Sequence, residues 1–222
     1  MQLRSTATNN ERICAMSQEF REKYEITPLT QAQLPQVARI LARAFHEDPI
    51  AQYMIPDEEE RVQRMPGVFA TFATYALLAG QVWTTAAAAK GVALCFPPAH
   101  TEMVPDHMAA AGFEELPAKI GEGATGRMFQ VLDHIEQFHK RDMPEPHWYL
   151  MLLGVEPDQQ GRGIGTSLVR KVLERADQDG VPCYLETANP QNVSFYGHLG
   201  FEVVVEDVEP ESGVRFSTFK RA

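Results

Sequence analysis

The stretch that decides the fold reads Leu153-Gly-Val-Glu-Pro-Asp-Gln-Gln-Gly-Arg-Gly-Ile-Gly-Thr166. Residues 148–155 form an apolar run of strand length, rich in aromatic and branched side chains, which predicts a buried strand. Beyond the stretch, apolar residues recur at helical spacing and predict an amphipathic helix: Leu168, Val169, Val172, Leu173 and Ala176. The glycines therefore lie in a turn between a strand and a helix.

This turn has the composition of an anion-binding cradle. Gly161, Gly163 and Gly165 carry no side chain, so a ligand can approach the backbone N–H groups closely. The first N–H groups of a helix also lack intrahelical partners and carry partial positive charge, which favours phosphate. We therefore expect residues 160–166 to bind a diphosphate. Arg162 either contacts one of its phosphates or is an ordinary solvated charge.

The spacing of the glycines narrows the choice of diphosphate ligand. The dinucleotide pattern G-x-G-x-x-G does not fit, and no Gly-Lys-Ser/Thr follows as in a phosphate-binding loop. A second motif follows downstream, with a predicted strand over 182–187, a turn at Asn189 and Pro190, a short helix over 192–198 and a strand from Phe201. Gly200 fits the left-handed position that ends this helix.

Together the two motifs resemble the acetyl-CoA signature of the GCN5-related N-acetyltransferases, the GNAT superfamily. Residues 160–165 read Q-x-x-G-x-G, and residues 189–201 are similar to the family's N-x-x-x-x-x-[FY]-Y-x-x-x-G-F block. The resemblance covers residues 148–201 and is diffuse elsewhere. It implies an acetyl-CoA-dependent N-acetyltransferase, in which acetyl-CoA is the acyl donor and no metal takes part.

The resemblance also implies the residues that hold the donor. In the family, backbone groups of the splayed strand meet the pantetheine and the thioester oxygen, and the asparagine region meets the pantetheine arm. The predicted donor-binding set is Leu153, Gly154, Val155, Gln160, Gly161, Arg162, Gly163, Ile164, Gly165, Thr166, Asn189, Asn192 and Tyr196.

Acyl transfer needs a general acid and a general base. Tyr196 matches the family tyrosine near the sulfur and is the predicted acid, with an aromatic core position as the alternative. His147 and Glu186, on or beside predicted strands, are the candidate bases, although Glu186 is equally compatible with a salt-bridged strand end. Cys95 and Cys183 lie in apolar strand patterns, where thiols are usually inert, so direct attack in a ternary complex is preferred over an acyl-enzyme.

The fold class expected from this resemblance is α/β (α+β). A mixed, mostly antiparallel sheet of about seven strands is flanked by helices and splayed between strands 4 and 5. Outside the motifs we predict a strand over 24–28, a helix over 34–45, a loop over 47–56 and a helix over 58–78 that kinks or breaks at Pro66. A hairpin over 82–96 and a last strand over 215–220, after a loop over 206–213, complete the sheet. We predict a flexible tail over 1–22 and a single acetyltransferase domain over 23–222.

Residues 98–146 are predicted to be a helical insertion between strands 3 and 4. Met128, Leu132, Ile135 and Phe138 mark one face of a helix, and a structureless loop of this length would be implausible. The insertion either shapes the acceptor pocket or serves packing, for instance in a homodimer. Most of its histidines are expected at the surface. His134 and His139 do not share a helix face, which argues against a paired metal site.

Composition limits the partners. The formal net charge of −10 argues against nucleic acid, which requires clustered lysine and arginine, and suits a cationic amine as well as simple solubility. The sequence offers no apolar run long enough for a membrane span and no secretory signal. Three cysteines without a disulfide or metal pattern suggest the cytoplasm.

The leading hypothesis is therefore an N-acetyltransferase that acts on the primary amine of a small molecule. A protein or peptide N-acetyltransferase and a non-catalytic acyl-CoA-binding sensor remain as alternatives. Asp48, Tyr53 and Asp57 are acceptor-side candidates, and loop capping is the favoured explanation for them.

Overall fold

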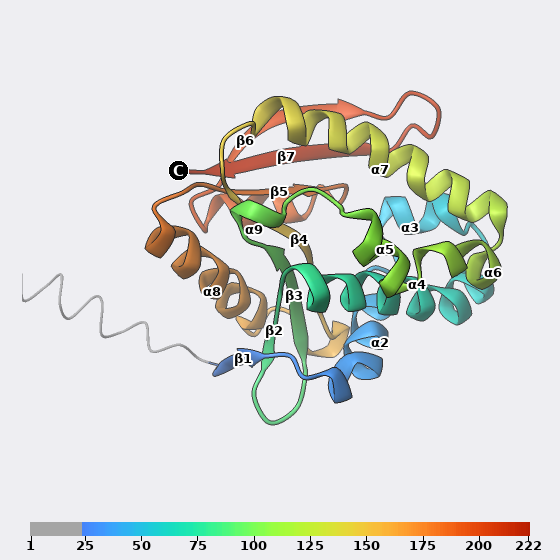
Figure 1. Ribbon diagram of the computed structural model, residues 1–222, viewed down its shortest axis with the longest axis horizontal. Coiled ribbons are helices and arrows are strands. Elements are labelled where there is room, and N and C mark those ends of the chain that lie inside the picture. The colour runs from blue at the N-terminus through green and yellow to red at the C-terminus, as the bar shows by residue number, and fades with distance from the viewer. Residues whose placement is uncertain (1–23) are drawn as a thin grey trace, which may run out of the picture.

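The computed structural model describes residues 24–222, and the predicted tail over 1–22 lies outside the described residues. Within that range the chain forms a seven-stranded sheet in the order β1-β2-β3-β4-β5-β7-β6 (Figure 1). Neighbouring strands are antiparallel except β4 and β5, which are parallel. The strands are β1 (Ile26–Pro28), β2 (Gln81–Thr85), β3 (Gly91–Phe96), β4 (Trp148–Val155), β5 (Cys183–Thr187), β6 (Glu202–Val208) and β7 (Arg215–Arg221). The predicted fold class is confirmed.

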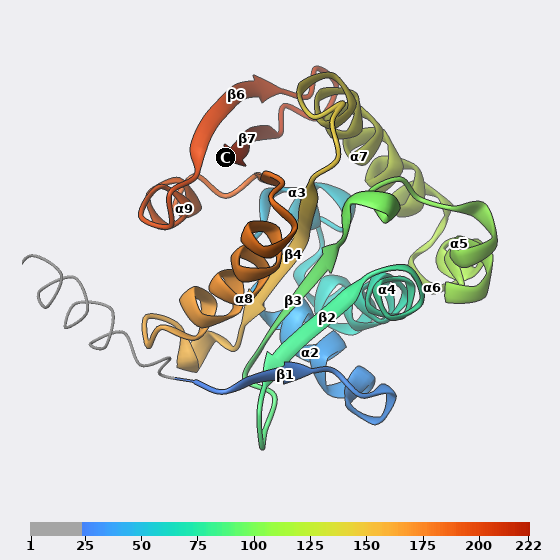
Figure 2. The same ribbon diagram turned by 60° about the vertical axis from the view of Figure 1, so that its left-hand side comes forward.

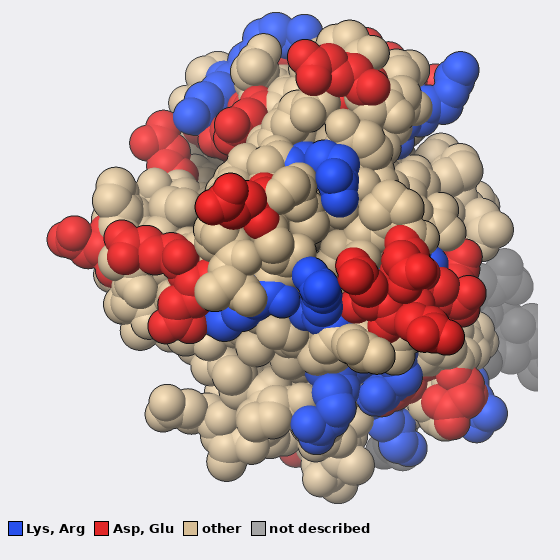
Figure 3. Space-filling view, turned by 90° about the vertical axis from the view of Figure 1, so that its right-hand side faces the viewer, with Lys and Arg blue, Asp and Glu red and all other residues tan. Residues whose placement is uncertain are grey.

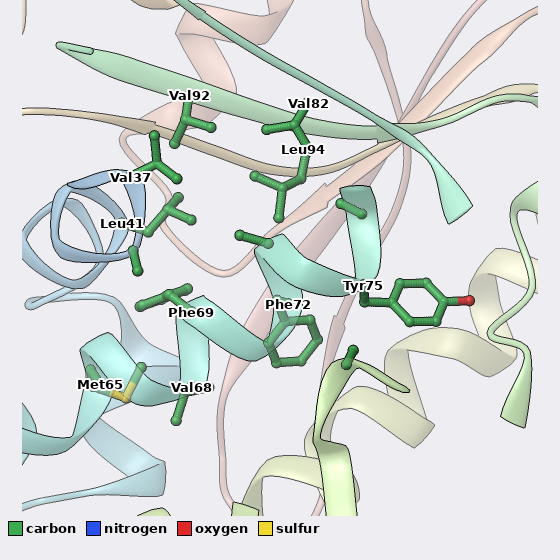
Figure 4. Close-up of a cluster of buried hydrophobic side chains, with 14 of the residues drawn as sticks. Val37, Leu41, Met65, Val68, Phe69, Phe72, Tyr75, Val82, Val92 and Leu94 are labelled. Carbon is green, nitrogen blue, oxygen red and sulfur yellow. The ribbon is translucent and has the colours of Figure 1, made fainter. Parts of the chain in front are cut away.

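Helices cover both faces of this sheet (Figure 2). On one face lie α2 (Leu34–Ala44) and α4 (Glu58–Ala79), and on the other lie α8 (Ile164–Asp179) and the short α9 (Asn192–Gly197). Figure 4 shows how α2 and α4 fill the first layer: Leu41 and Phe69 lie between the two helices, and Val92 covers them from the sheet. A second cluster, under α8, includes Leu168 and Val172. The central strand β3 is therefore buried on both sides.

Pro66 does not break α4, which runs without interruption over 22 residues. A proline inside a helix leaves the carbonyl four residues earlier without its usual donor. Here that residue is Val62, which is 59% exposed, so water can reach this part of the backbone. The predicted break is therefore absent.

Residues 98–146 form helices, as predicted. They are α5 (Pro105–Ala111), α6 (Leu116–Ile120) and α7 (Glu122–Asp142), with the short 3₁₀ turns η2 (Pro98–His100) and η3 (Phe113–Glu115). The left-handed glycines Gly112 and Gly121, at φ 85° and 86°, separate these helices. Beyond its contact with α3 and α6, α7 reaches the β5–β7 side of the sheet, where Ile135 packs in a cluster with Phe216.

Two predicted loops are partly wrong. Residues 47–56 contain helix α3 (Pro49–Met54), which begins because the Asp48 side chain accepts a hydrogen bond from the Ile50 N–H at 2.9 Å and Pro49 takes the first helical position. Strand β6 continues to Val208, past the predicted loop start at residue 206. It is an edge strand with one exposed face, so the acidic residues at its end, Glu206 and Asp207, resemble a loop. The remaining 3₁₀ turns are η1 (Gln31–Gln33) and η4 (Pro157–Gln159).

The surface agrees with an ordinary acidic globular protein. On the face shown in Figure 3, acidic and basic side chains alternate, and no extended basic area is present on it. Within residues 24–222, every helix is too short or too polar to span a lipid bilayer.

Strands β4 and β5 diverge almost as soon as they meet. They pair only at Trp148 with Cys183 and at Tyr149 with Tyr184. Beyond this point β4 follows β3, from Leu150 to Val155, and β5 follows β7. The predicted splay between strands 4 and 5 is therefore confirmed, and it opens the sheet on the side where Glu186 and Leu153 lie.

Candidate active site

The predicted diphosphate turn has the expected backbone geometry. Gly161 has a φ of 71° and Gly163, the N-cap of α8, has a φ of 91°, both in the left-handed region that favours glycine. The first N–H groups of α8, from Ile164 onward, have no intrahelical acceptor, as at any helix start. Gln160 closes the turn, because its side-chain amide donates to the Val155 carbonyl at 3.2 Å. These residues fit a pyrophosphate.

Neighbouring elements hold the turn in place. The Glu156 carboxylate pairs with Arg43 of α2, and the Glu156 N–H donates to the Lys90 carbonyl at 2.9 Å. Gly154 is a glycine for a packing reason: a Cβ there would lie 2.8 Å from Leu41 Cδ2. Glycine at this point of β4 therefore lets α2 approach the strand. This packing reason is independent of any contact between Gly154 and the donor.

The other predicted donor-binding residues differ in where they lie. Asn192 lines the cavity described below and donates to the Thr187 hydroxyl at 3.0 Å. Asn189 shapes the turn instead, because its Oδ1 accepts from the Gln191 N–H at 3.0 Å. The Ile164 side chain is buried under α8, so only its backbone is available to a ligand. Arg162 is exposed on the turn and enters none of the ion pairs found within residues 24–222.

A cavity of about 460 Å³ extends from the splayed strands into the helical layer. Helices α3, α4 and α7 and the segment after β3 enclose it together with β4 and β5. Its walls are mainly apolar and include Met54, Met65, Phe69, Phe72, Met103 and Phe129. The cavity therefore offers room for a small molecule with a hydrophobic body.

The charged groups of the cavity are mostly acidic. Glu102 and Asp133 are exposed residues of its lining, whereas Asp48 and Glu136 lie deeper, and Lys140 pairs with Glu136 at 3.4 Å. Burial raises the pKa of Asp48 to about 6 against the opposing effect of backbone N–H groups at the start of α3. This excess of carboxylates favours a cationic ligand.

Glu186 is the most buried of these acids at the splay. Its side chain is 8% exposed, and among the described residues its Oε1 atom has no hydrogen-bond partner. Burial raises the pKa of Glu186 to about 7. His139 and the Tyr149 hydroxyl oppose this shift, and the Glu136 carboxylate adds to it. Glu186 lines the cavity, so it is a carboxylate that can gain or lose a proton near neutral pH.

His147 does not reach the cavity lining but lies behind another histidine. Its Nε2 atom is 2.7 Å from Nε2 of His139, and its Nδ1 atom is 2.7 Å from the Glu145 carbonyl oxygen. Both histidines are 3% exposed, so the expected surface position is wrong for them. His139 lies on the buried face of α7 together with Val131 and Ile135, at a spacing of four residues. The face predicted from the sequence ended at Phe138 and therefore did not include His139.

Tyr196 is a core residue that also lines the cavity. Its ring packs edge-on against Phe195 and Phe201 at 5.0 and 5.8 Å, and the residue also lines the cavity with Glu186. Burial raises the pKa of Tyr196, so its hydroxyl stays protonated at neutral pH and can donate.

Of the remaining candidates, Asp57 caps α4 by accepting from the Glu60 N–H at 2.8 Å, and Tyr53 lies outside the cavity lining.

We expect Tyr196→Phe to lower kcat about tenfold. The loss is modest because a thiolate of ordinary pKa is a good leaving group that needs little help from an acid. Thiol release at saturating substrates measures the effect, with Tyr53→Phe, outside the cavity lining, as the matched control. An unchanged kcat would remove Tyr196 from the chemistry and leave it as a core residue.

Three features together are typical of an acyltransferase. They are the splayed parallel strand pair, the glycine turn at the start of a helix, and the cavity with a buried carboxylate. Residues 125–201 match the model of the acetyltransferase (GNAT) family. This part of the chain is therefore similar to the GNAT superfamily, whose acyl donor is acetyl-CoA.

Relatives agree with this assignment. An uncharacterised N-acetyltransferase of Schizosaccharomyces pombe is 24% identical over 169 residues, which cover 74% of this chain and 68% of the relative. A structure of histone acetyltransferase HPA2 and related acetyltransferase from Corynebacterium glutamicum has a TM-score of 0.66 at 22% identity and covers 89% of this chain and 95% of its own. Arylalkylamine N-acetyltransferase 2 from Aedes aegypti has a TM-score of 0.60 at 13% identity. The match covers 90% of this chain and 99% of the Aedes aegypti chain. These structures share the fold.

Proposed function

We propose that this protein transfers the acetyl group of acetyl-CoA to the primary amine of a small molecule, by direct attack in a ternary complex. The observation that carries the proposal is the buried Glu186 carboxylate, which faces an apolar cavity where β4 and β5 part. The turn over 160–166 and the last residues of β4 are the proposed donor site. Donor and acceptor would then meet at the splay.

Each residue has a defined task in this scheme. Backbone N–H groups of residues 160–166 hold the pyrophosphate of acetyl-CoA, which supplies a thioester when bound. Glu186 takes one proton from the ammonium group, the freed amine nitrogen bonds to the acetyl carbon, and the carbon–sulfur bond breaks. Tyr196 donates a proton to the departing thiolate, and the second proton that the nitrogen loses on becoming an amide restores the Tyr196 hydroxyl. We propose that a backbone N–H of residues 153–155 stabilises the oxyanion.

The raised pKa of Glu186 decides whether this proton transfer is feasible. An alkylammonium has a pKa of about 10, so transfer to an ordinary carboxylate would cost about 8 kcal/mol. With Glu186 at a pKa of about 7, the cost falls to about 4 kcal/mol. Burial of Glu186 therefore removes about half of the cost, which supports its role as general base over that of a salt-bridged strand end.

The cavity supports a monoamine with an apolar body as the acceptor. Its apolar walls favour burial of hydrocarbon, and Glu186 at the splay suits one ammonium group. Asp48 already accepts the Ile50 N–H and Glu136 already pairs with Lys140, so a second ammonium group deep in the cavity would gain less from these carboxylates than it loses with its water. The name of the related Aedes aegypti structure, an arylalkylamine N-acetyltransferase, agrees with this chemistry.

A panel of amines tests the proposal through thiol release from acetyl-CoA. Hexylamine and 1,5-diaminopentane form a matched pair of equal chain length, and phenethylamine, spermidine, an aminoglycoside and a histone-tail peptide complete the panel. We expect kcat/KM for hexylamine to exceed that for the diamine by about tenfold or more, the effect of leaving one ammonium group in water. Release with the peptide alone would instead indicate protein acetylation. Acetyl-CoA binding without release for any amine would indicate a sensor.

A further inference from the structure

Behind Glu186 lies a row of buried groups that the proposed reaction does not yet use. His139 Nδ1 is 3.7 Å from Glu186 Oε1, His139 Nε2 is 2.7 Å from His147 Nε2, and His147 Nδ1 is 2.7 Å from the Glu145 carbonyl oxygen. These groups come from β5, from α7 and from the segment before β4. The row therefore links the cavity with the backbone of residue 145.

The hydrogen-bond contacts along this row determine which ring nitrogens of the two histidines carry a hydrogen. A carbonyl oxygen only accepts, so Nδ1 of His147 must carry a hydrogen. Burial lowers the pKa of His147 and keeps it neutral, which leaves its Nε2 as an acceptor. His139 must then donate through Nε2. The Nδ1 atom of His139 is consequently the nitrogen of this row that faces Glu186.

Two carboxylates and two aromatic rings surround that nitrogen. Glu136 Oε2 lies 3.6 Å from His139 Nδ1, nearly as close as Glu186, and among the described residues Nδ1 has no hydrogen-bond partner. The imidazole ring stacks on Tyr184 at 4.5 Å and lies 4.4 Å from the Tyr149 ring. Carboxylates and aromatic faces both stabilise an imidazolium. The nearby cation is Lys140, which pairs with Glu136 on the exposed side of α7.

We infer that Glu186 and His139 act as one proton-accepting pair, in which His147 is a positioning residue that fixes the tautomer of His139. The inference rests on the proposed function for Glu186. A charge on His139 lowers the pKa of Glu186 and so favours its ionised form although the cavity is apolar. When the amine attacks, one ammonium N–H bond breaks and one O–H bond forms on Glu186. The pair thus keeps the base ready at a pH where an isolated buried carboxyl would be protonated.

His139→Gln tests the pair, because glutamine can donate to His147 but cannot carry a charge. Loss of the imidazolium should raise the pKa of Glu186, so the acid limb of the kcat/KM profile should move up by about one pH unit. We expect roughly a tenfold loss at pH 6 and little loss at pH 9. His134→Gln is the matched control, since His134 lies on α7 3.0 Å from Asp207 and outside the cavity lining. An unmoved limb, or an equal loss at every pH, would overturn the inference.

Two substitutions of His147 test the positioning role. The carbonyl of His147→Gln can accept from His139 Nε2, whereas His147→Phe cannot. We expect the glutamine variant to keep the acid limb near its original pH and the phenylalanine variant to move it upward, as in His139→Gln. Equal limbs in the two variants would show that the hydrogen bond does not set the pH dependence.

Nitrogen-15 NMR of labelled histidines supplies a readout that does not need activity. In the free protein we expect His147 to carry its hydrogen on Nδ1 across pH 6 to 8 and His139 to carry one on Nε2. A hydrogen on Nε2 of His147 would overturn the inference even in an active enzyme. If no amine is acetylated but this tautomer pattern is found, the proposed function fails and the histidine arrangement stands.

Discussion

Glu186→Gln should lower kcat by about two to four orders of magnitude, the usual contribution of a general base. Glutamine keeps the shape of the side chain but cannot take the ammonium proton. Thiol release at pH 8 with saturating acetyl-CoA and amine measures the loss, and acetyl-CoA affinity should not change. Glu174→Gln, on the surface of α8, is the matched control. A variant with turnover close to that of the unchanged protein would exclude Glu186 as the base.

The same residue predicts two opposite pH trends. Activity requires ionised Glu186, so kcat/KM should rise with pH through about 7. Stability should fall over part of that range, because the folded protein keeps the Glu186 proton up to a pKa of about 7 while the unfolded chain loses it near 4.5. This difference amounts to about 3 kcal/mol between pH 4.5 and pH 7 and then levels off. Glu186→Gln should therefore raise the melting temperature at pH 8 and change it little at pH 4.5.

Gly163→Ala should raise the KM for acetyl-CoA by about thirtyfold. A side chain at a φ of 91° strains the backbone, and the N–H groups at the start of α8 would shift away from the pyrophosphate. Losing one charge-assisted hydrogen bond of about 2 kcal/mol accounts for the factor.

Gly180→Ala supplies the control for this change. Gly180 ends the same helix at a φ of 65°, and a Cβ there meets nothing within 4 Å. Both variants should lower the melting temperature by a similar amount, but only Gly163→Ala should raise the KM. If both raise it equally, general destabilisation explains the effect and the turn has no special role in donor binding.

The strand, turn and helix over residues 148–179 could be predicted because their signals are local. An apolar run, left-handed glycines and helical periodicity each act within a few residues, and β4 has the predicted bounds. Helix α3 was missed because it has only six residues and depends on the Asp48 cap. The edge strand β6 was cut short because its exposed acidic residues resemble a loop, although β7 pairs with it up to Val208.

The candidate site could be predicted only in part, for a similar reason. Glu186 and Tyr196 lie in or beside the motif that identifies the donor site, and both line the cavity. His139 became visible only when α7 was placed against β4 and β5, because contacts between distant segments leave no periodic signal nearby. Its aromatic neighbours Tyr149 and Tyr184 come from two other strands.

Helix α7 contributes both to the wall of the cavity and to the contacts of Glu186. The donor turn lies in one contiguous segment after β4, whereas α7 supplies both the cavity wall through Met128 and Leu132 and the imidazole of His139. Substitutions confined to the turn over residues 160–166 could therefore change the affinity for the proposed donor without affecting the cavity. A change of α7 that admits a different amine would also alter the pair that we propose to deprotonate it. Acceptor preference and working pH should accordingly diverge together among proteins that share this helix.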